Sequence, residues 1–229
     1  MSNFVYGKAF FDLKESIKPE WHKFINHEFV MKISDGTLPS TNFIFYLKQD
    51  FIFLSHFSRA WALAVTKSQD WKEMSLASST VQALVNFEMK LHINFCKKKG
   101  ILEKELSLEK EAKENLAYTR YVLEAGYSGG FLDLIVCLMP CIIGYGEIGK
   151  NLSSSTSSVY ADWIGTYSSE DYQKVCSDVG HLFDYSIKKR FGNNYKKLPY
   201  WGLLKSRFKT ATELETNFWN MGIMYRNSK

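Results

Sequence analysis

Three acidic residues stand where the helical pattern of the chain calls for an apolar side chain. Asp50, Glu88 and Glu215 each lie three or four residues from apolar neighbours, a spacing that keeps them on one face of a helix. The three faces are Phe43, Leu47, Asp50, Leu54, Phe57, Trp61; Val81, Leu84, Glu88, Leu91, Phe95; and Phe208, Ala211, Glu215, Phe218, Gly222, Tyr225. Burial of an unpaired carboxylate is costly or forces it to protonate, so these positions predict a polar pocket, a metal site or internal hydrogen bonds.

A fourth helical face adds a thiol and a phenol to the predicted interior. It runs through Leu134, Leu138, Cys141, Tyr145 and Ile148. Pro140 cannot donate a backbone hydrogen bond, so we expect the helix to kink or open beside Cys141. Carboxyl, thiol and phenol groups that face one interior are typical of an enzyme site, although a cysteine in an apolar helix is more often a small core residue.

Two more tyrosines, Tyr118 and Tyr167, lie on or beside predicted interior faces. A buried phenol needs a hydrogen-bond partner. A flat heteroaromatic ligand stacked between rings would explain phenols together with carboxylates, and hydrogen bonds to nearby carbonyls would explain them equally well. The sequence leaves both interpretations open.

Structural alternatives exist for two of the acidic residues. Asp50 could be an internal acceptor that pairs with a buried arginine, and Arg59 is the candidate partner. Glu88 and His92 are four residues apart, whereas a di-iron carboxylate bundle uses Glu-x-x-His from two helices and two further glutamates. The spacing predicts no metal site, and we expect Glu88 to be an acceptor that supports the site from behind.

The totals are those of an ordinary globular protein. The chain has 229 residues, 45% of them hydrophobic and 23% charged, with a net charge of +5. Its lysines are scattered and no DNA-binding motif accompanies them, so no nucleic-acid partner is expected. We expect no signal peptide and no membrane span, and hence a cytoplasmic location in which the four cysteines stay reduced. The absence of a CxxC motif argues against a zinc site.

The helical periodicity predicts an all-α protein with a single domain over residues 1–229. Proline is scarce, and turn residues such as Gly36, Gly100 and Gly126 separate long apolar-periodic segments. The predicted helices are residues 7–25, 28–33, 41–67, 71–99, 109–126, 129–152, 157–166, 169–189 and 200–226. No alternating run between hairpin turns predicts a strand.

Several short segments, in this order, resemble the thiaminase II family, also called TenA, over nearly the whole chain. They are His27-Glu28-Phe29-Val30, Gly36-Thr37-Leu38-Pro39, Tyr46-Leu47-Lys48-Gln49-Asp50, Glu88-Met89-Lys90-Leu91-His92, Tyr118-Thr119, Pro140-Cys141, Trp163-Ile164-Gly165-Thr166-Tyr167 and Glu215-Thr216-Asn217-Phe218-Trp219. The resemblance implies a heme-oxygenase-like helical bundle, usually a homotetramer, that holds no heme, metal or other cofactor.

The resemblance also implies a role for each candidate residue. Cys141 would be the nucleophile, Glu215 the acid/base, and Asp50 the acceptor for the amino and nitrogen groups of a pyrimidine. The pocket would be lined by Tyr118, Tyr145 and Tyr167, with Phe218 stacked on the ring. One position departs from the family: Phe53 stands where a tyrosine is common, which removes a hydroxyl from the pocket.

The implied reaction is hydrolysis of 4-amino-5-aminomethyl-2-methylpyrimidine, and more slowly of thiamine, to the hydroxymethylpyrimidine in thiamine salvage. A soft nucleophile, an acid/base and ring-orienting acceptors suit this chemistry. Because carboxylates near a thiol raise its pKa, we expect proton transfer on attack and no resting thiolate. The alternatives are a non-catalytic pyrimidine-binding or regulatory relative and a di-metal oxidase, which the Glu88–His92 spacing disfavours.

Overall fold

The predicted all-α bundle is confirmed by the computed structural model, which describes residues 5–155 and 159–226 and, within them, all side chains except those of Phe87 and Leu91. The helices are α1 (Lys8–Ser16), α2 (Lys18–Ile25), α3 (Glu28–Asp35), α4 (Ser40–Lys67), α5 (Trp71–Ala83), α6 (Met89–Lys98), α7 (Glu103–Ser107), α8 (Lys113–Ser128), α9 (Phe131–Met139), α10 (Tyr145–Leu152), α11 (Ala161–Ser168), α12 (Glu170–Phe191) and α13 (Pro199–Met224). A short 3₁₀ turn, η3 (Tyr195–Lys197), precedes α13. The start of the predicted helix at 157 and the side chain of Leu91 lie outside the described residues.

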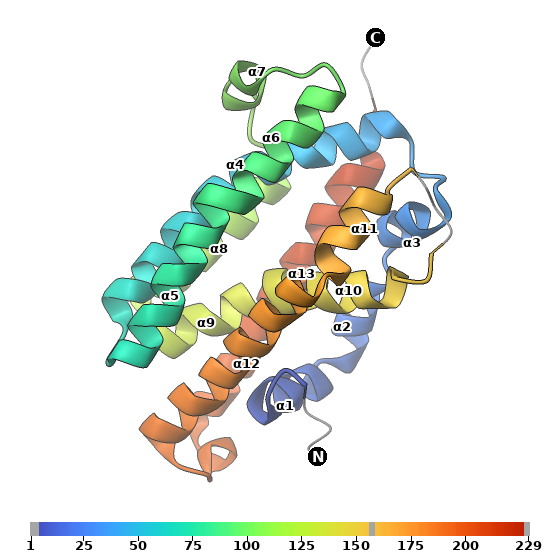
Figure 1. Ribbon diagram of the computed structural model, residues 1–229. Helices are drawn as coiled ribbons and strands as arrows, with labels where there is room; N and C mark the ends of the chain where they lie inside the picture. The colour runs from blue at the N-terminus through green and yellow to red at the C-terminus, as the bar shows by residue number, and fades with distance from the viewer. Residues whose placement is uncertain (1–4, 156–158, 227–229) are drawn as a thin grey trace.

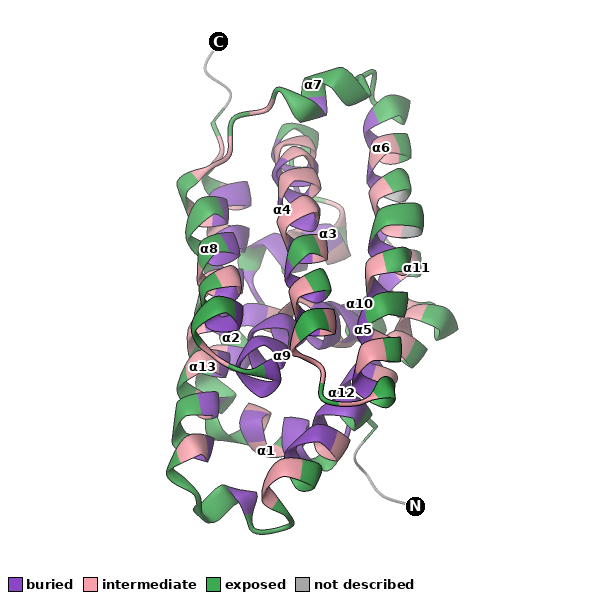
Figure 2. Ribbon diagram, turned by 90° about the vertical axis from the view of Figure 1, so that its left-hand side faces the viewer, coloured by how far each residue is buried: buried purple, intermediate pink, exposed green. Residues whose placement is uncertain are grey.

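Helix α4 and helix α13 form the centre of the bundle. α4 packs against α5 and α8, and α13 packs against α8, α9 and α2. In Figure 1 the rod formed by α9 and α10 crosses the middle of the molecule, with α12 and α11 beside it. Figure 2 shows α9 as buried on all sides, because every one of its nine residues is buried. The interior of the bundle therefore lies where the four predicted apolar faces converge.

Two predicted helices are continuous rods with a π-helical turn inside them. The turn η1 (Leu84–Glu88) joins α5 to α6, and the turn η2 (Pro140–Gly144) joins α9 to α10. The predicted opening of the helix at Pro140 is confirmed and takes the form of this π turn. π turns inside helices are frequent at functional sites. The two turns hold Glu88 and Cys141, so both residues are candidates for the site.

Other boundaries differ from the prediction for local reasons. Residues 7–25 form two helices, because Ile17 leaves the helical region with φ −129° and Pro19 starts the second. The predicted helix 109–126 begins at Lys113, and the five-residue helix α7 precedes it. A helix this short has too few periodic positions to be recognised in a sequence.

Aromatic packing fixes the inward face of α13. The ring of Trp219 stacks on Phe29 with centroids 5.0 Å apart and also contacts Tyr46 at 5.4 Å. A Cβ atom at Gly222 would lie 2.6 Å from the ring of Phe29, so glycine permits this approach. These contacts set the rotation of α13, and Glu215, one turn before Trp219, consequently faces the interior.

A glycine also brings α11 close to α10. A Cβ atom at Gly149 would lie 2.4 Å from the carbonyl carbon of Tyr167. The close approach allows the ring of Tyr167 to pack on Tyr145 with centroids 5.0 Å apart. Gly149 thus positions Tyr167 on the wall of the interior.

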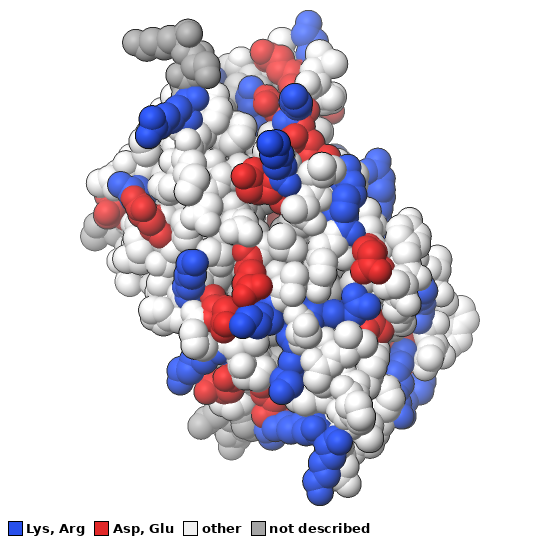
Figure 3. All heavy atoms as spheres, turned by 180° about the vertical axis from the view of Figure 1, so that it is seen from behind, with Lys and Arg blue, Asp and Glu red and all other residues white. Residues whose placement is uncertain are grey.

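The surface carries charges of both signs. On the face opposite to that of Figure 1, Lys and Arg lie among Asp and Glu and do not gather in one patch (Figure 3). The segment Phe131–Leu152 is long and apolar enough to cross a membrane. However, 89% of its most apolar 18-residue stretch is buried inside the protein, so the segment is a core helix of this fold.

Candidate active site

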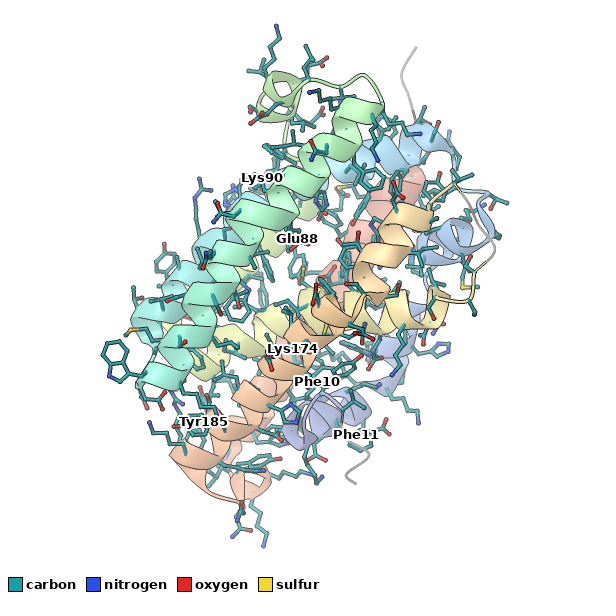
Figure 4. All side chains as sticks on the ribbon, viewed as in Figure 1. Phe10, Phe11, Glu88, Lys90, Lys174 and Tyr185 are labelled. Atoms are coloured by element: carbon teal, nitrogen blue, oxygen red, sulfur yellow. The ribbon has the colours of Figure 1, made fainter. Side chains whose placement is uncertain are left out.

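A cavity of about 480 Å³ opens between α5–α6, α11 and α12 and reaches the predicted nucleophile. Its wall includes Cys141, Glu88, His92, Tyr167 and Tyr172. In Figure 4 Glu88 lies between the α5–α6 rod and α11–α12. Aliphatic and aromatic side chains make up most of the remaining wall, the composition of a small-molecule site.

Cys141 lies in the π turn η2 and is half-buried. Burial raises the pKa of its thiol well above the usual range, and the nearby carboxyls of Glu215, Glu88 and Asp50 raise it further. The direction agrees with the expectation from the sequence, but burial is the larger cause. The thiol therefore keeps its proton until a base removes it.

Glu215 is the predicted base. Its side chain on α13 is 1% exposed, and Tyr118 on α8 donates a hydrogen bond of 2.9 Å to Oε1. Burial raises the pKa of Glu215 to about 8, although the hydrogen bond from Tyr118 and a bond with the thiol of Cys141 oppose the rise. The electrostatics of Glu215 and Cys141 are coupled, as expected of a thiol and an acid/base that belong to one site.

Asp50 is 4% exposed and pairs with His92. The Nε2 atom of His92 lies 2.5 Å from Oδ2 of Asp50, and the hydroxyl of Tyr46 lies 3.4 Å from the same oxygen. The suggested pairing with Arg59 is wrong. Arg59 Nη1 lies 3.3 Å from Nδ1 of His56 on the exposed side of α4.

Glu88 lines the cavity itself, which places it nearer the thiol than the supporting position expected from the sequence. Burial and the charge of Asp50 raise the pKa of Glu88 to about 7, while His92 and a hydrogen bond with Tyr167 limit the rise. At neutral pH the carboxyl of Glu88 is therefore close to half-protonated and can hold or release a proton.

The remaining predicted residues form an aromatic cluster around these groups. Phe53 packs on Tyr118 at 5.0 Å and on Phe218 at 5.6 Å between ring centroids. Tyr145 packs on Trp219 at 5.2 Å. The cluster does not line the cavity, and Asp50 and Glu215 do not line it either. The cavity gives access to the thiol of Cys141, which does line it.

Tyr172 of the cavity wall was not predicted as a site residue, and neither were Tyr46 and His92 beside Asp50.

Tyr46 and His92 share one sequence signal. Each lies four residues from a predicted carboxylate on the same helical face, Tyr46 before Asp50 and His92 after Glu88. That spacing is the signal that could have found them. His92 was considered only as a metal ligand, whereas it pairs with a carboxylate on another helix.

Pairing separates these carboxyls from the structural acids of the fold. Glu73 is fully buried and accepts a hydrogen bond of 2.9 Å from Nη2 of Arg190, and Asp133 forms an ion pair of 3.0 Å with Nε of Arg207. Among the residues that the structure describes, no lysine or arginine pairs with the three site carboxyls, Asp50, Glu88 and Glu215. Buried carboxyls with raised pKa values, such as Glu88 and Glu215, are typical of an active site.

Comparison with known proteins adds relatives of stated activity. The chain is 34% identical to an aminopyrimidine aminohydrolase of Halalkalibacterium halodurans, covering 91% of this chain and 92% of that protein. It is 28% identical to an aminopyrimidine aminohydrolase of Bacillus subtilis, covering 88% and 84%. A solved structure from Silicibacter sp. TM1040, described as a TenA family transcription regulator, superposes with a TM-score of 0.96 at 50% identity, covering 98% of this chain and all of that one.

The family model described as TENA/THI-4/PQQC matches residues 14–225, which is nearly the whole chain. The match includes every residue of the candidate site. The resemblance noted in the sequence is therefore confirmed, and the chain belongs to the TENA/THI-4/PQQC family.

Proposed function

We propose that this chain hydrolyses 4-amino-5-aminomethyl-2-methylpyrimidine to the 5-hydroxymethyl compound and ammonia. The observation that carries the proposal is a small-molecule cavity that reaches the thiol of Cys141, with the buried carboxyl of Glu215 close enough to raise the pKa of that thiol. Relatives that share about a third of the sequence over nearly its whole length are named aminopyrimidine aminohydrolase, which supports the substrate class.

The reaction begins when Glu215 takes the proton of Cys141 and the sulfur bonds to an electron-poor carbon of the pyrimidine ring. Glu215 returns this proton to a ring nitrogen. The electron pair of the dearomatised ring then expels the protonated amine from the methylene carbon as ammonia. Water adds to that carbon and loses a proton, the C–S bond breaks, and the thiol leaves as the aromatic ring is restored.

The protonation states of the free protein suit this sequence of steps. The thiol pKa is raised by burial and by three carboxyls, so the resting protein holds a thiol and not a thiolate. Proton transfer and attack must then be coupled. Rapid alkylation of Cys141 well below neutral pH would contradict this step.

Asp50 would accept a hydrogen bond from the amino group of the ring, and Tyr118, Tyr145, Tyr167 and Phe218 would pack around it. Phe53 provides a ring contact without a hydroxyl, so it would influence substrate preference more than the reaction. We also propose slower hydrolysis of thiamine, a role in thiamine salvage, and a cytoplasmic homotetramer, as the family resemblance implies.

A regulatory role is the alternative, because the relative from Silicibacter that is 50% identical is described as a transcription regulator. A regulator that only binds a pyrimidine has no need of a thiol in contact with an acid/base. Hydrolysis therefore accounts for more of the site.

The test is turnover of the aminomethylpyrimidine, and separately of thiamine, by the wild type and by Cys141→Ser. We expect the serine variant to lose at least about a thousandfold in kcat. Cys137→Ser is the matched control, because Cys137 is a buried cysteine of the same rod that does not line the cavity. Absence of turnover by a folded wild type would refute the proposed reaction.

A further inference from the structure

The imidazole of His92 is hydrogen-bonded at both ring nitrogens. Nδ1 lies 3.0 Å from the main-chain oxygen of Glu88, one turn earlier in the same rod. Nε2 lies 2.5 Å from Oδ2 of Asp50 on α4. The His92 side chain is 4% exposed, so bulk water does not compete for either nitrogen.

These two contacts determine how many protons the pair holds. A carbonyl oxygen has no proton, so Nδ1 must be the donor to Glu88. A bare nitrogen and a carboxylate would face each other with lone pairs at 2.5 Å, so a second proton must lie between Nε2 and Oδ2. The pair therefore carries both ring protons and has no net charge when Asp50 is an anion.

The surroundings favour a cationic ring in this pair. Burial lowers the pKa of His92, but the charge of Asp50, the hydrogen bond to it and the charge of Glu88 outweigh burial and raise the pKa to about 9. The other titratable groups near Asp50 and Glu88 are acids or neutral donors. They are Tyr46 on α4, Cys96 on α6, Cys141 on η2, Tyr145 on α10, Tyr167 on α11, Tyr172 and Cys176 on α12, and Glu215 on α13.

We propose that His92 is a positioning residue that holds Asp50 through a donated hydrogen bond and keeps it turned toward the substrate. His92 and Tyr46 both occupy Oδ2, which leaves Oδ1 to accept the amino hydrogen of the pyrimidine. A protonated Asp50 would lose part of its capacity as an acceptor, and Glu88 and Glu215 would otherwise favour that protonation. The inference rests on the proposed function for the role of Asp50, but the proton count does not depend on it.

His27 provides an internal comparison within the same protein. Its Nδ1 accepts a hydrogen bond of 3.2 Å from the backbone N–H of Phe29, so Nδ1 carries no proton. Its Nε2 then donates to Oδ1 of Asn220 at 3.0 Å. Burial lowers the pKa of His27. His27 is therefore expected to be a neutral ring, and His92 a ring with two protons.

The first experiment is ¹⁵N NMR of the histidine rings in the ligand-free full chain at pH 7. His92 is assigned by the signals that disappear in His92→Gln. We expect both nitrogens of His92 to carry protons, while Nδ1 of His27 shows the shift of an unprotonated nitrogen. A bare nitrogen on His92 at this pH would overturn the proposal, whether or not the protein has the proposed activity.

The second experiment separates the charge of His92 from its hydrogen bond. Gln can place its amide nitrogen near the position of Nε2 and donate to Asp50, but it carries no charge. The dissociation constant of the hydroxymethylpyrimidine product is measured from pH 5 to 8 for the wild type and for His92→Gln. Dividing the dissociation constant of the variant by that of the wild type at each pH cancels the effect of the ligand's own titration.

We expect the variant to bind on the order of tenfold or more weakly at pH 5 and to approach the wild type at pH 8, because the uncharged amide leaves Asp50 without a cation beside the other acids of the site. His181→Gln, an exposed histidine of α12, is the matched control and should follow the wild type throughout. A ratio that does not change with pH would overturn the proposal. If the wild type binds the product but does not turn over the substrate, the proposed reaction fails and the inference about His92 stands.

Discussion

The hydrogen bond from Tyr118 to Glu215 can be removed by a single substitution that keeps the ring. Tyr118→Phe deletes the hydroxyl that donates 2.9 Å to Oε1 and retains the packing of the ring on Phe53 at 5.0 Å. The pKa of Tyr118 is raised well above its usual value by burial and by Glu215, so the hydroxyl stays a donor across any practical pH range.

The size of the effect follows from the strength of that bond. A hydrogen bond to an ionised group contributes about 1.5–3 kcal/mol, and about 1.4 kcal/mol corresponds to one pKa unit. Without the bond, the ionised form of Glu215 loses this stabilisation, so its pKa rises from about 8 by roughly one to two units. Because the ionised form must accept the thiol proton, kcat/KM at pH 7 should fall by roughly tenfold to a hundredfold.

The assay is kcat/KM for the aminomethylpyrimidine between pH 6 and 9.5. We expect the rising limb to move to higher pH in Tyr118→Phe, with the difference from the wild type narrowing toward the alkaline end. Tyr121→Phe is the control, since Tyr121 is half-buried on the same helix and bonds Thr210 outside the site. A reduction that is equal at every pH, or an unchanged limb, would refute the assignment of Glu215 as the base.

Three further substitutions, together with one glycine control, test the energetics of the fold. The pKa of Glu215 is about 8 in the folded protein, against a usual value of 4.5, so the free energy of unfolding of the wild type falls as the pH rises from 4.5 to 8. Glu215→Gln removes this loss. It should raise the free energy of unfolding by about 1–3 kcal/mol at pH 8.5 and change it little at pH 4.5. Arg190→Ala leaves the buried carboxyl of Glu73 without its cation and should cost about 3–5 kcal/mol. Gly149→Ala forces a Cβ atom against the main chain of α11 and should cost about 1–3 kcal/mol, whereas Gly165→Ala, with nothing within 4 Å, should stabilise slightly.

Denaturant unfolding measures all three effects, and each has its own contrary result. Equal stability gains for Glu215→Gln at pH 4.5 and 8.5 would show that the carboxyl does not titrate as described. A loss below about 1 kcal/mol for Arg190→Ala would place that pair among exposed ion pairs. Equal effects of the two glycine substitutions would show that the approach of α11 to α10 is not tight.

Helical periodicity correctly predicted that Asp50 and Glu215 face the interior. Spacing along one helix determines a face, and Asp50 and Glu215 are buried as their apolar neighbours require. Pairing between helices is not encoded in any such local pattern. The contact of His92 with Asp50 depends on α6 lying beside α4, so sequence reasoning offered Arg59, a residue close in the chain, in place of a partner 42 positions away.

Local rules also concealed buried acids and one of the two π turns. Glu73 and Asp133 lie in the first turns of α5 and α9, where acids usually cap an exposed helix end, yet both are buried against arginines. Pro140 predicted a break in the helix at Cys141, whereas no proline or glycine occurs in the turn Leu84–Glu88 to indicate a break there. That second turn depends on packing that only the folded chain supplies.

The π turn at Pro140–Gly144 has a consequence for the rod that contains it. A π turn is an α-helix with one residue inserted, so the segment after it is rotated by about 100° relative to an unbroken helix. One rod therefore presents its apolar residues toward the central bundle in α9 and toward α11 in α10. The extra residue therefore rotates α10 relative to α9. Deleting one position from the turn would restore an unbroken helix and rotate Tyr145 and the rest of α10 away from their present positions beside Cys141.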